Sequence, residues 1–205
     1  MKLQKIVFVT VVAILLVNAT SFAQKGKSSS GNCVAQGTIL FDAFYGFPYF
    51  NGTLLKAAYA SDSITTTSTI HNYNHFACGK VEYMISDNIG LGLEFTYAKV
   101  TIRYQSSNSL WYDGGIDKYR ILGKMNYHFA TNSNIDPYLT WGAGYKNTKV
   151  YDTQPGAGPD ITINLVPVAF RVGIGMRYFF TDLIGVNAEV GMGGPIMQAG
   201  LSLKL

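Results

Sequence analysis

Eight segments of the chain alternate apolar and polar residues with a period of two, and this pattern constrains the fold more than any other feature. A period of two predicts β-strands that have one apolar face and one polar face. The predicted strands cover residues 35–46, 72–86, 88–104, 115–129, 137–151, 163–179, 183–193 and 196–205. In the sixth strand, Arg171 and Arg177 share the polar face, while Ile174 lies on the apolar face. The predicted fold class is therefore all-β.

Alternation alone also suits a soluble sandwich or a lipocalin-like barrel, so the sizes of the residues on the two faces decide between these folds. The apolar face carries large residues such as Trp141 and Phe170, whereas the polar face is rich in glycine, including Gly142, Gly144 and Gly175. The interior of an eight-stranded barrel is only wide enough for side chains to fill, so small residues belong inside. The large apolar residues then face lipid. We predict an eight-stranded, antiparallel, up-and-down transmembrane β-barrel over residues 35–205.

The predicted connections between strands alternate in length. Those on one side are long, at residues 47–71, 105–114 and 152–162, apart from a short connection at 194–195. Those on the other side are short and consist of residue 87, residues 130–136 and residues 180–182. Bacterial outer-membrane barrels have short periplasmic turns and longer external loops. We therefore expect the cell outer membrane as the location and the periplasm as the side of both termini.

Aromatic residues on the apolar face are spaced as expected for the two edges of a lipid band. Tyr119 and Tyr127 lie eight residues apart, as do Phe170 and Tyr178. At roughly 3.4 Å per residue and a strand tilt near 40°, eight residues rise about 21 Å, close to the height of the band between two aromatic girdles.

The first residues of the chain have the layout of a secretory signal peptide. Lys2 and Lys5 precede an apolar run over residues 6–17, and the small-residue site Ser21-Phe22-Ala23 follows. The run is too short for a spanning helix, which needs about 20 residues. We expect residues 1–23 to be removed by cleavage after Ala23, and residues 24–34 to form a flexible periplasmic leader.

One hairpin motif occurs twice, as Tyr83-x3-Asp87-x2-Gly90-x3-Glu94 and as Tyr178-x3-Asp182-x2-Gly185-x3-Glu189. The first copy, KVEYMISDNIGLGLEFTYA, resembles the repeated hairpin of the small outer-membrane barrel superfamily that includes OmpA-, OmpX- and OmpW-like proteins. The resemblance covers residues 35–205 as architecture. It implies outer-membrane lipid, lipopolysaccharide and the barrel assembly machinery as partners. Such barrels usually end in an aromatic residue that the machinery reads, whereas this chain ends in Leu205.

The hairpins predict which charged residues meet inside the barrel. A turn at Asp87 places Lys80 opposite Glu94 and Glu82 opposite Gly92, and the second turn places Glu189 opposite Gly175. Buried charges must be paired to be tolerated. We therefore predict a network of paired charges in the lumen, formed by Lys80, Glu82, Glu94, Arg120, Lys124, Arg171, Arg177 and Glu189. Such a network either plugs a narrow barrel as a structural element or lines a pore as a gate or proton-linked site.

The sequence gives little sign of cofactor chemistry or nucleic-acid binding. The net charge of +4 falls when Lys2 and Lys5 leave, so the mature chain lacks the basic excess of a nucleic-acid-binding protein. Three histidines and two cysteines show no metal-ligand spacing, so no metal or cofactor is expected. We predict that Cys33 and Cys78 are free thiols, because the first precedes the first strand whereas the second lies about halfway along its neighbour.

Three functions suit these features. The first is a non-enzymatic structural or surface-interaction barrel with a charge-filled lumen, whose long loop 47–71 binds a surface ligand. The second is a narrow channel for small or apolar solutes, lined by inward apolar residues such as Leu40, Phe44 and Leu122. The third is a lipid A-modifying hydrolase, which would use the rim histidines His71 and His75 beside the Thr65–Thr69 tract. The 128–133 stretch is expected to be a periplasmic turn. We favour the first function, which is not an enzyme.

Overall fold

The computed structural model of the chain describes residues 33–47, 68–69, 77–105, 110–129, 134–153, 161–162 and 167–205. Eight long strands follow one another: β1 (Ile39–Phe47), β3 (Ala77–Met84), β4 (Ile89–Gln105), β5 (Trp111–His128), β6 (Ile135–Asp152), β8 (Val168–Phe179), β9 (Ile184–Met192) and β10 (Met197–Lys204). Two short strands, β2 (Ser68–Thr69) and β7 (Ile161–Thr162), complete the set. No helix in this described part is long and apolar enough to cross a membrane. The predicted signal peptide and most of the leader lie outside the described residues.

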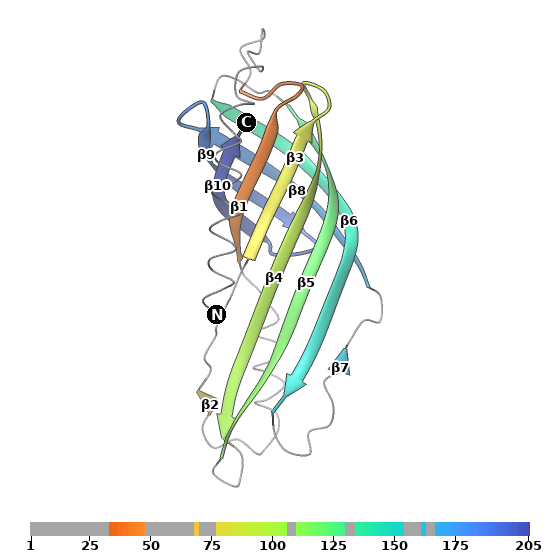
Figure 1. Cartoon of the computed structure of the whole chain (residues 1–205), viewed down its shortest axis with the longest axis vertical. Helices are drawn as coiled ribbons and strands as arrows, with labels where there is room; N and C mark the ends of the chain where they lie inside the picture. Colours follow the sequence, from red (N-terminus) through yellow and green to blue (C-terminus); the bar gives the residue numbers. More distant parts are fainter. Residues whose placement is uncertain are drawn as a thin grey trace.

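The eight long strands form a closed antiparallel barrel, as predicted. The hydrogen-bonded order runs β4, β3, β1, β10, β9, β8, β6, β5, and a further pairing of β4 with β5 closes the ring. β1 pairs with β10 from Leu40–Lys204 to Phe47–Met197, so the beginning of β1 lies beside the end of β10 (Figure 1). We call this the turn end, because the short connections at 85–88, 129–134 and 180–183 also lie there; the other is the loop end.

At the loop end, β5 is longer than the sequence predicts. β5 begins at Trp111, inside the predicted loop 105–114, and its ladder with β4 continues to the pair Gln105–Trp111. An ion pair of 2.8 Å between Arg103 and Asp113 crosses this ladder. Gly115 is the first residue of the predicted strand; the ring of Tyr151 lies over it, and an added Cβ would sit 2.5 Å from the tyrosine hydroxyl. The aromatic ring thus fills the space that glycine leaves, and the strand continues.

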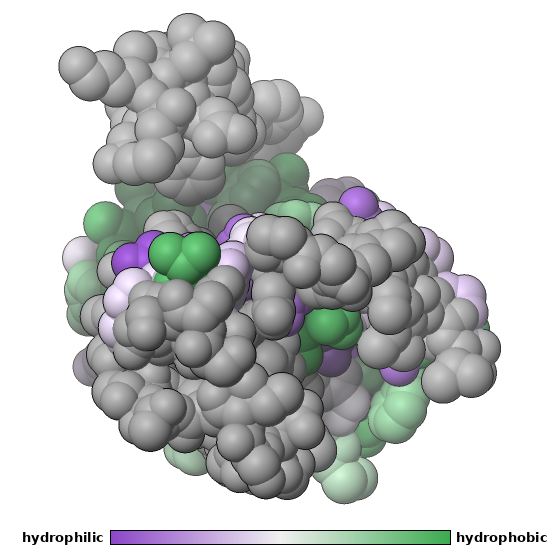
Figure 2. All heavy atoms as spheres, turned by 90° about the horizontal axis from the view of Figure 1, so that it is seen from below, coloured by the Kyte–Doolittle hydropathy of each residue, from purple (hydrophilic) through white to green (hydrophobic). Residues whose placement is uncertain are grey.

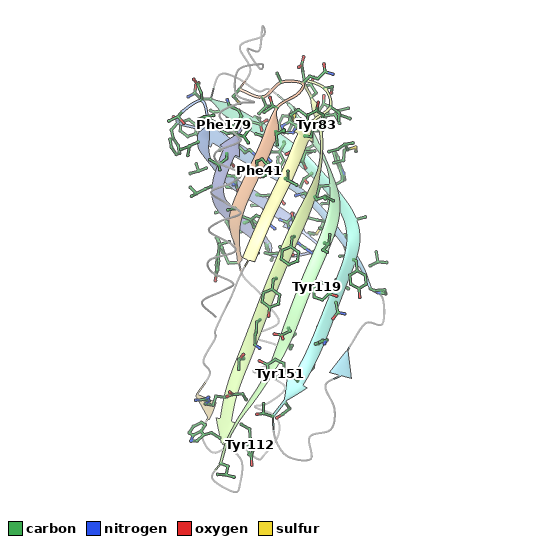
Figure 3. The ribbon with its side chains drawn as sticks, viewed as in Figure 1. Phe41, Tyr83, Tyr112, Tyr119, Tyr151 and Phe179 are labelled. Atoms are coloured by element: carbon green, nitrogen blue, oxygen red, sulfur yellow. The ribbon has the colours of Figure 1, made fainter. Side chains whose placement is uncertain are left out.

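Three strands therefore project beyond the rest of the barrel at the loop end. β4, β5 and β6 have 17, 18 and 18 residues, against 8 to 12 in the other long strands. β2 adds to the edge of β4, and β7 adds to the edge of β6, so the predicted loops 47–71 and 152–162 each contain a short strand. We call this part the projecting sheet; Tyr119, Tyr151 and Tyr112 mark successive levels along it (Figure 3).

The outer wall of the barrel is apolar, and the inner wall is polar. Outward residues such as Leu93 and Ile174 are 57% and 52% exposed, and the predicted girdle residues Tyr127 and Phe170 are exposed as well. Figure 2 looks from the tip of the projecting sheet, and green hydrophobic atoms lie along the sides of the barrel behind it. A soluble barrel would bury these residues, so the burial pattern is that of a barrel whose outside contacts lipid.

Candidate functional site

All eight residues of the predicted charge network point into the lumen. None is more than 7% exposed: Lys80, Glu82, Glu94, Arg120, Lys124, Arg171, Arg177 and Glu189. The predicted registers, Lys80 opposite Glu94, Glu82 opposite Gly92 and Glu189 opposite Gly175, are confirmed. These side chains, with others that sequence reasoning missed, form two clusters at successive heights in the barrel.

The turn-side cluster consists of Asp42, Glu82, His128, Asp136 and Arg177. The Arg177 guanidinium contacts three carboxylates, with Nη2 2.9 Å from Asp42 and 2.7 Å from Glu82, and Nη1 3.1 Å from Asp136. The hydroxyl of Ser202 donates a further hydrogen bond of 2.5 Å to Asp42. Arg177 therefore joins acidic groups from β1, β3 and β6, which lie far apart in the sequence.

His128 completes the turn-side cluster. Its Nδ1 lies 2.6 Å from Asp136 Oδ1, and its Nε2 lies 2.8 Å from Glu82 Oε1. Ionised carboxylate oxygens only accept hydrogen bonds, so both bonds are made when His128 is an imidazolium ion that donates from each nitrogen. The expectation that 128–133 is wholly a turn is wrong at His128, which is the last residue of β5 and is fully buried.

The loop-side cluster consists of Lys80, Glu94, Arg120, Lys124, Arg171 and Glu189. Glu189 accepts from Lys80 at 2.6 Å, from Lys124 at 3.2 Å and from Arg171. Glu94 accepts from Arg120 at 2.7 Å and from Lys124 at 3.0 Å. Lys124 bridges the two carboxylates. Although Lys80 is opposite Glu94 in the register, its ammonium group reaches across the barrel to Glu189.

The two clusters differ in their balance of charge. The loop-side cluster has four cations and two carboxylates, whereas the turn-side cluster has three carboxylates, one guanidinium and His128. The loop-side cluster therefore has an excess of positive charge, whereas the turn-side cluster does not. The two clusters together hold similar numbers of both signs, and such pairing makes buried charge tolerable in a protein interior.

Tyr138 connects the two clusters and explains why a glycine lies beside it. Its hydroxyl donates to Glu189 over 3.2 Å, and the Arg177 guanidinium lies 4.5 Å from its ring centroid. A Cβ on Gly175 would come within 2.3 Å of the tyrosine ring. Similarly, a Cβ on Gly90 would overlap the Glu82 carboxylate. Glycines on the inner wall thus make room for the long side chains that cross the lumen, as the sequence predicts.

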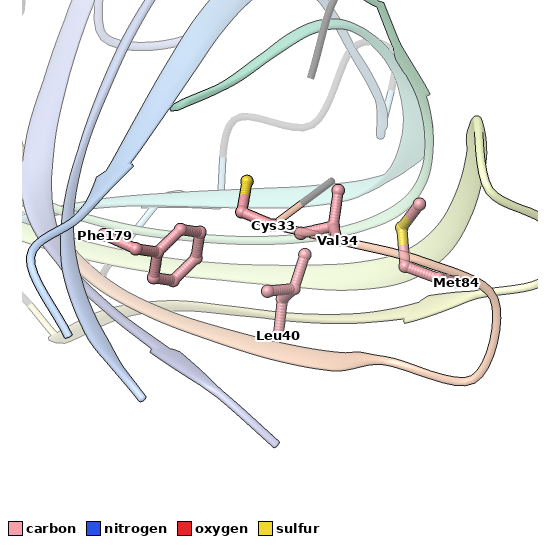
Figure 4. Packing of buried hydrophobic residues seen from close by; sticks show 5 residues of the cluster. All are labelled: Cys33, Val34, Leu40, Met84 and Phe179. Carbon is pink, nitrogen blue, oxygen red and sulfur yellow. The ribbon is translucent and has the colours of Figure 1, made fainter. Parts of the chain in front are cut away.

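The turn end of the lumen is closed by an apolar cluster formed by Cys33, Val34, Leu40, Met84 and Phe179 (Figure 4). The first two of these residues precede β1, and residues 35–38 form a turn that returns the chain to the barrel wall, rather than the predicted start of the strand. Gly37 allows this turn because glycine readily adopts a positive φ, which is 89° here. Its amide donates to the Met84 carbonyl. We call the cluster of Cys33, Val34, Leu40, Met84 and Phe179 the apolar plug.

Both cysteines are thiols in the structure and do not form the Cys33–Cys78 disulfide, as predicted. Cys33 is buried in the apolar plug, where desolvation raises the pKa of its thiol to about 11. Cys78 is the second residue of β3, near the loop end, rather than halfway along the strand. The two thiols are thus located toward opposite ends of the barrel.

Three acidic or basic residues of the turn-side cluster were not singled out by sequence reasoning: Asp42, His128 and Asp136. Each lies at an inward position of its strand, so alternation alone assigns it to the lumen. The alternation of inward and outward positions along each strand was the feature that could have identified them. Asp136 was missed because it falls in the predicted turn 130–136.

The described residues offer little for catalysis or metal binding. A serine hydrolase needs a base that accepts the serine proton, but both nitrogens of His128 face carboxylates, and Ser202 donates to Asp42 instead. Within these residues, no group of three His, Cys, Asp or Glu side chains could hold a metal ion. His71, His75 and most of the loop 47–71 lie outside the part of the chain that the structure describes.

This chain is similar to one protein family and to several solved structures. Residues 10–193 match the family described as outer membrane protein beta-barrel domain. The N-terminal β-barrel domain of OprF from Pseudomonas aeruginosa is 15% identical, covers 84% of this chain and 100% of that chain, and has a TM-score of 0.47. Outer membrane protein W of E. coli is 16% identical over 83% and 99% of the two chains, with a TM-score of 0.42. The Ail protein of Yersinia pestis is 13% identical over 82% and 95%, with a TM-score of 0.41. No curated protein sequence matches this chain.

The family match extends over most of the sequence, and the family description names a β-barrel, which is the fold of the structure. On these grounds, the chain belongs to the outer membrane protein beta-barrel domain family.

Proposed function

We propose that this protein is a non-enzymatic, non-conducting barrel that anchors the projecting sheet and its loops at the cell surface. The observation that carries this proposal is the closure of the lumen. Two charge clusters cross it with side chains that are at most 7% exposed, and the apolar plug covers its turn end. A solute would have to break several buried ion pairs and displace apolar residues to pass.

The apolar residues expected to line a channel support closure instead. Leu40 and Leu122 are 1% and 0% exposed, and Leu40 is part of the apolar plug. Phe44 is also buried, and its ring lies beneath the Lys80 ammonium at 4.7 Å from the centroid. These side chains fill space between the strands and the charge clusters, so an apolar path along the lumen has no support.

The projecting sheet is suited to water rather than lipid. On its outer face, Lys99 pairs with Asp117 at 3.7 Å, and Arg103 pairs with Asp113 at 2.8 Å. Exposed ion pairs of this kind belong outside the hydrocarbon region. We therefore place the loop end at the cell surface and the turn end in the periplasm, with the apolar wall against outer-membrane lipid and lipopolysaccharide.

In this orientation, the loop 47–71 and the projecting sheet would meet a surface ligand. Insertion would use the barrel assembly machinery.

Single-channel recording tests the proposal. Protein purified from cells that express the full chain is reconstituted in a planar bilayer, with folding checked by the heat-dependent gel mobility of barrels. We expect no steady conductance. Two variants are compared with it: Glu94→Gln changes the loop-side cluster, and Asp113→Asn changes the projecting sheet. A steady current that Glu94→Gln alters and Asp113→Asn leaves unchanged would show a pore through the lumen and refute the proposal.

A further inference from the structure

Three cations on two neighbouring strands point into the loop end of the lumen, and only one has an anionic partner. Arg120 pairs with Glu94. Lys118 lies two residues farther along β5, and Lys146 of β6 is directly opposite Arg120 in the register. Both lysines are half-buried, and neither forms an ion pair with any residue in the described ranges. We call Lys118, Arg120 and Lys146 the basic mouth.

The carboxylates nearest to the basic mouth are already used. Glu94 is shared by Arg120 and Lys124, and Glu189 accepts from three other groups of the loop-side cluster. Arg171, which is fully buried, also retains an Nη2 group without a hydrogen-bond partner. Like charges in a poorly solvated space repel one another, and among the described residues the cations at this end of the lumen outnumber the carboxylates.

The basic mouth lies where the lumen opens toward the loops. Tyr119 follows Lys118, and Tyr145 precedes Lys146; on the outer wall, their rings form a pair with centroids 6.0 Å apart. These tyrosines belong to the aromatic residues expected at one edge of the lipid band. The three cations therefore lie just inside the wall at the height of the membrane surface.

A floor beneath the basic mouth prevents it from being a passage. Arg120 Nη1 donates to the Gly193 carbonyl, and Arg171 Nη1 donates to the Pro195 carbonyl over 3.0 Å. The turn between β9 and β10 is thereby held to β5 across the lumen and to β8, the neighbour of β9 in the sheet. Below this level, the acidic turn-side cluster would repel an anion. The floor closes the basic mouth toward the turn end, so a ligand would approach it from the loop end.

We infer that the basic mouth binds a phosphate-type oxyanion. The ammonium groups of Lys118 and Lys146 can bind phosphate through charge-assisted hydrogen bonds. Arg120, whose guanidinium is held by Thr96, Gly193 and Glu94, adds its positive charge beneath them. A multivalent oxyanion would offset the repulsion among the three cations and leave the ion pairs beneath in place. The site faces the lumen, where a soluble phosphate ester could enter, and it lies at membrane height, where the headgroup of lipopolysaccharide is located. The phosphate can therefore belong to either.

Isothermal titration with inorganic pyrophosphate at low ionic strength tests the inference. The protein, purified from cells that express the full chain, is held in nanodiscs of zwitterionic lipid. We expect saturable binding that the double variant Lys118→Gln/Lys146→Gln weakens about tenfold or more. The matched control, Lys99→Gln/Lys149→Gln, removes the same charge from outward positions of the projecting sheet and is expected to bind as tightly as the wild type.

Two results would overturn the inference. One is the absence of saturable binding to the wild type, and the other is equal weakening by the two double variants, which would indicate only general attraction to a basic surface. A second set of nanodiscs contains lipopolysaccharide and distinguishes the sources of phosphate. Competition with pyrophosphate there identifies the headgroup, whereas unchanged titration identifies a soluble ester. Conductance is recorded separately, so failure of this inference leaves the proposed closure of the lumen standing.

Discussion

Arg177 is the residue on which the turn-side cluster depends most, and replacing it with methionine tests how the lumen is held together. Its guanidinium, fully buried, contacts Asp42, Glu82 and Asp136 at 2.7 to 3.1 Å. Arg177→Met keeps much of the apolar stem but leaves three buried carboxylates with His128 as the remaining cation of the cluster. Removal of one partner from a buried ion pair costs about 3–5 kcal/mol. We therefore expect the free energy of unfolding to fall by at least that amount.

The assay is urea unfolding of the barrel in lipid vesicles, followed by tryptophan fluorescence. Arg103→Met is the matched control, because Arg103 also pairs with a carboxylate but is half exposed, and such pairs contribute about 0–1 kcal/mol. The double variant Asp42→Asn/Arg177→Met should recover part of the loss, because one carboxylate no longer lacks its partner. Equal stability of the two arginine variants would refute the reasoning that buried charge pairing maintains the closed lumen.

Four further outcomes are expected. Ile174→Arg places a charge on the lipid-facing wall and should lower the free energy of unfolding by about 2–4 kcal/mol; an unchanged urea midpoint would mean that this wall is not in lipid. The neighbouring Gly175→Leu should destabilise the barrel by about 1–3 kcal/mol in the same assay, because even its Cβ would overlap the Tyr138 ring, and full stability would contradict the inward assignment. Because the pKa of Cys33 is raised to about 11, only about one thiol in a thousand is ionised at pH 8. Mass spectrometry after maleimide treatment should therefore find Cys33 unmodified until the protein is unfolded. Rapid labelling would place Cys33 outside the apolar plug. Arg103→Cys should react with a membrane-impermeant maleimide on intact cells, and protection there would reverse the proposed orientation.

Much of the barrel could be predicted from the sequence because the inner and outer walls have different chemistry at every second residue. Alternation assigned Arg171 and Ile174 to opposite walls without reference to other strands, and the hairpin at Asp87 fixed the register of β3 and β4. Residues 111–114 of the projecting sheet were assigned to a loop, because the predicted strand begins only at Gly115. Only the position of Tyr151, on another strand, shows how its missing side chain is replaced.

The partners within the charge network could not be predicted for a related reason. Asp42 and Arg177 are 135 positions apart, and they meet because β1 and β8 lie across the lumen from each other. Which cation reaches which carboxylate depends on the stagger of the strands around the ring, and hairpin registers alone do not determine it. Lys80 illustrates the point, since its register partner is Glu94 but its closest carboxylate is Glu189.

The charged lumen also accounts for the choice of one strand register over its neighbours. A slip of β8 by one residue would exchange its two faces, placing Arg171 and Arg177 against lipid and Ile174 in the lumen. Each arginine near the middle of the bilayer would cost about 2–4 kcal/mol, and the carboxylates that it serves would lose their partner. An apolar lumen would carry no such penalty, because its residues would be equally stable on the outer wall. The network therefore specifies the register even if its net contribution to stability is small compared with that of a well-packed apolar core.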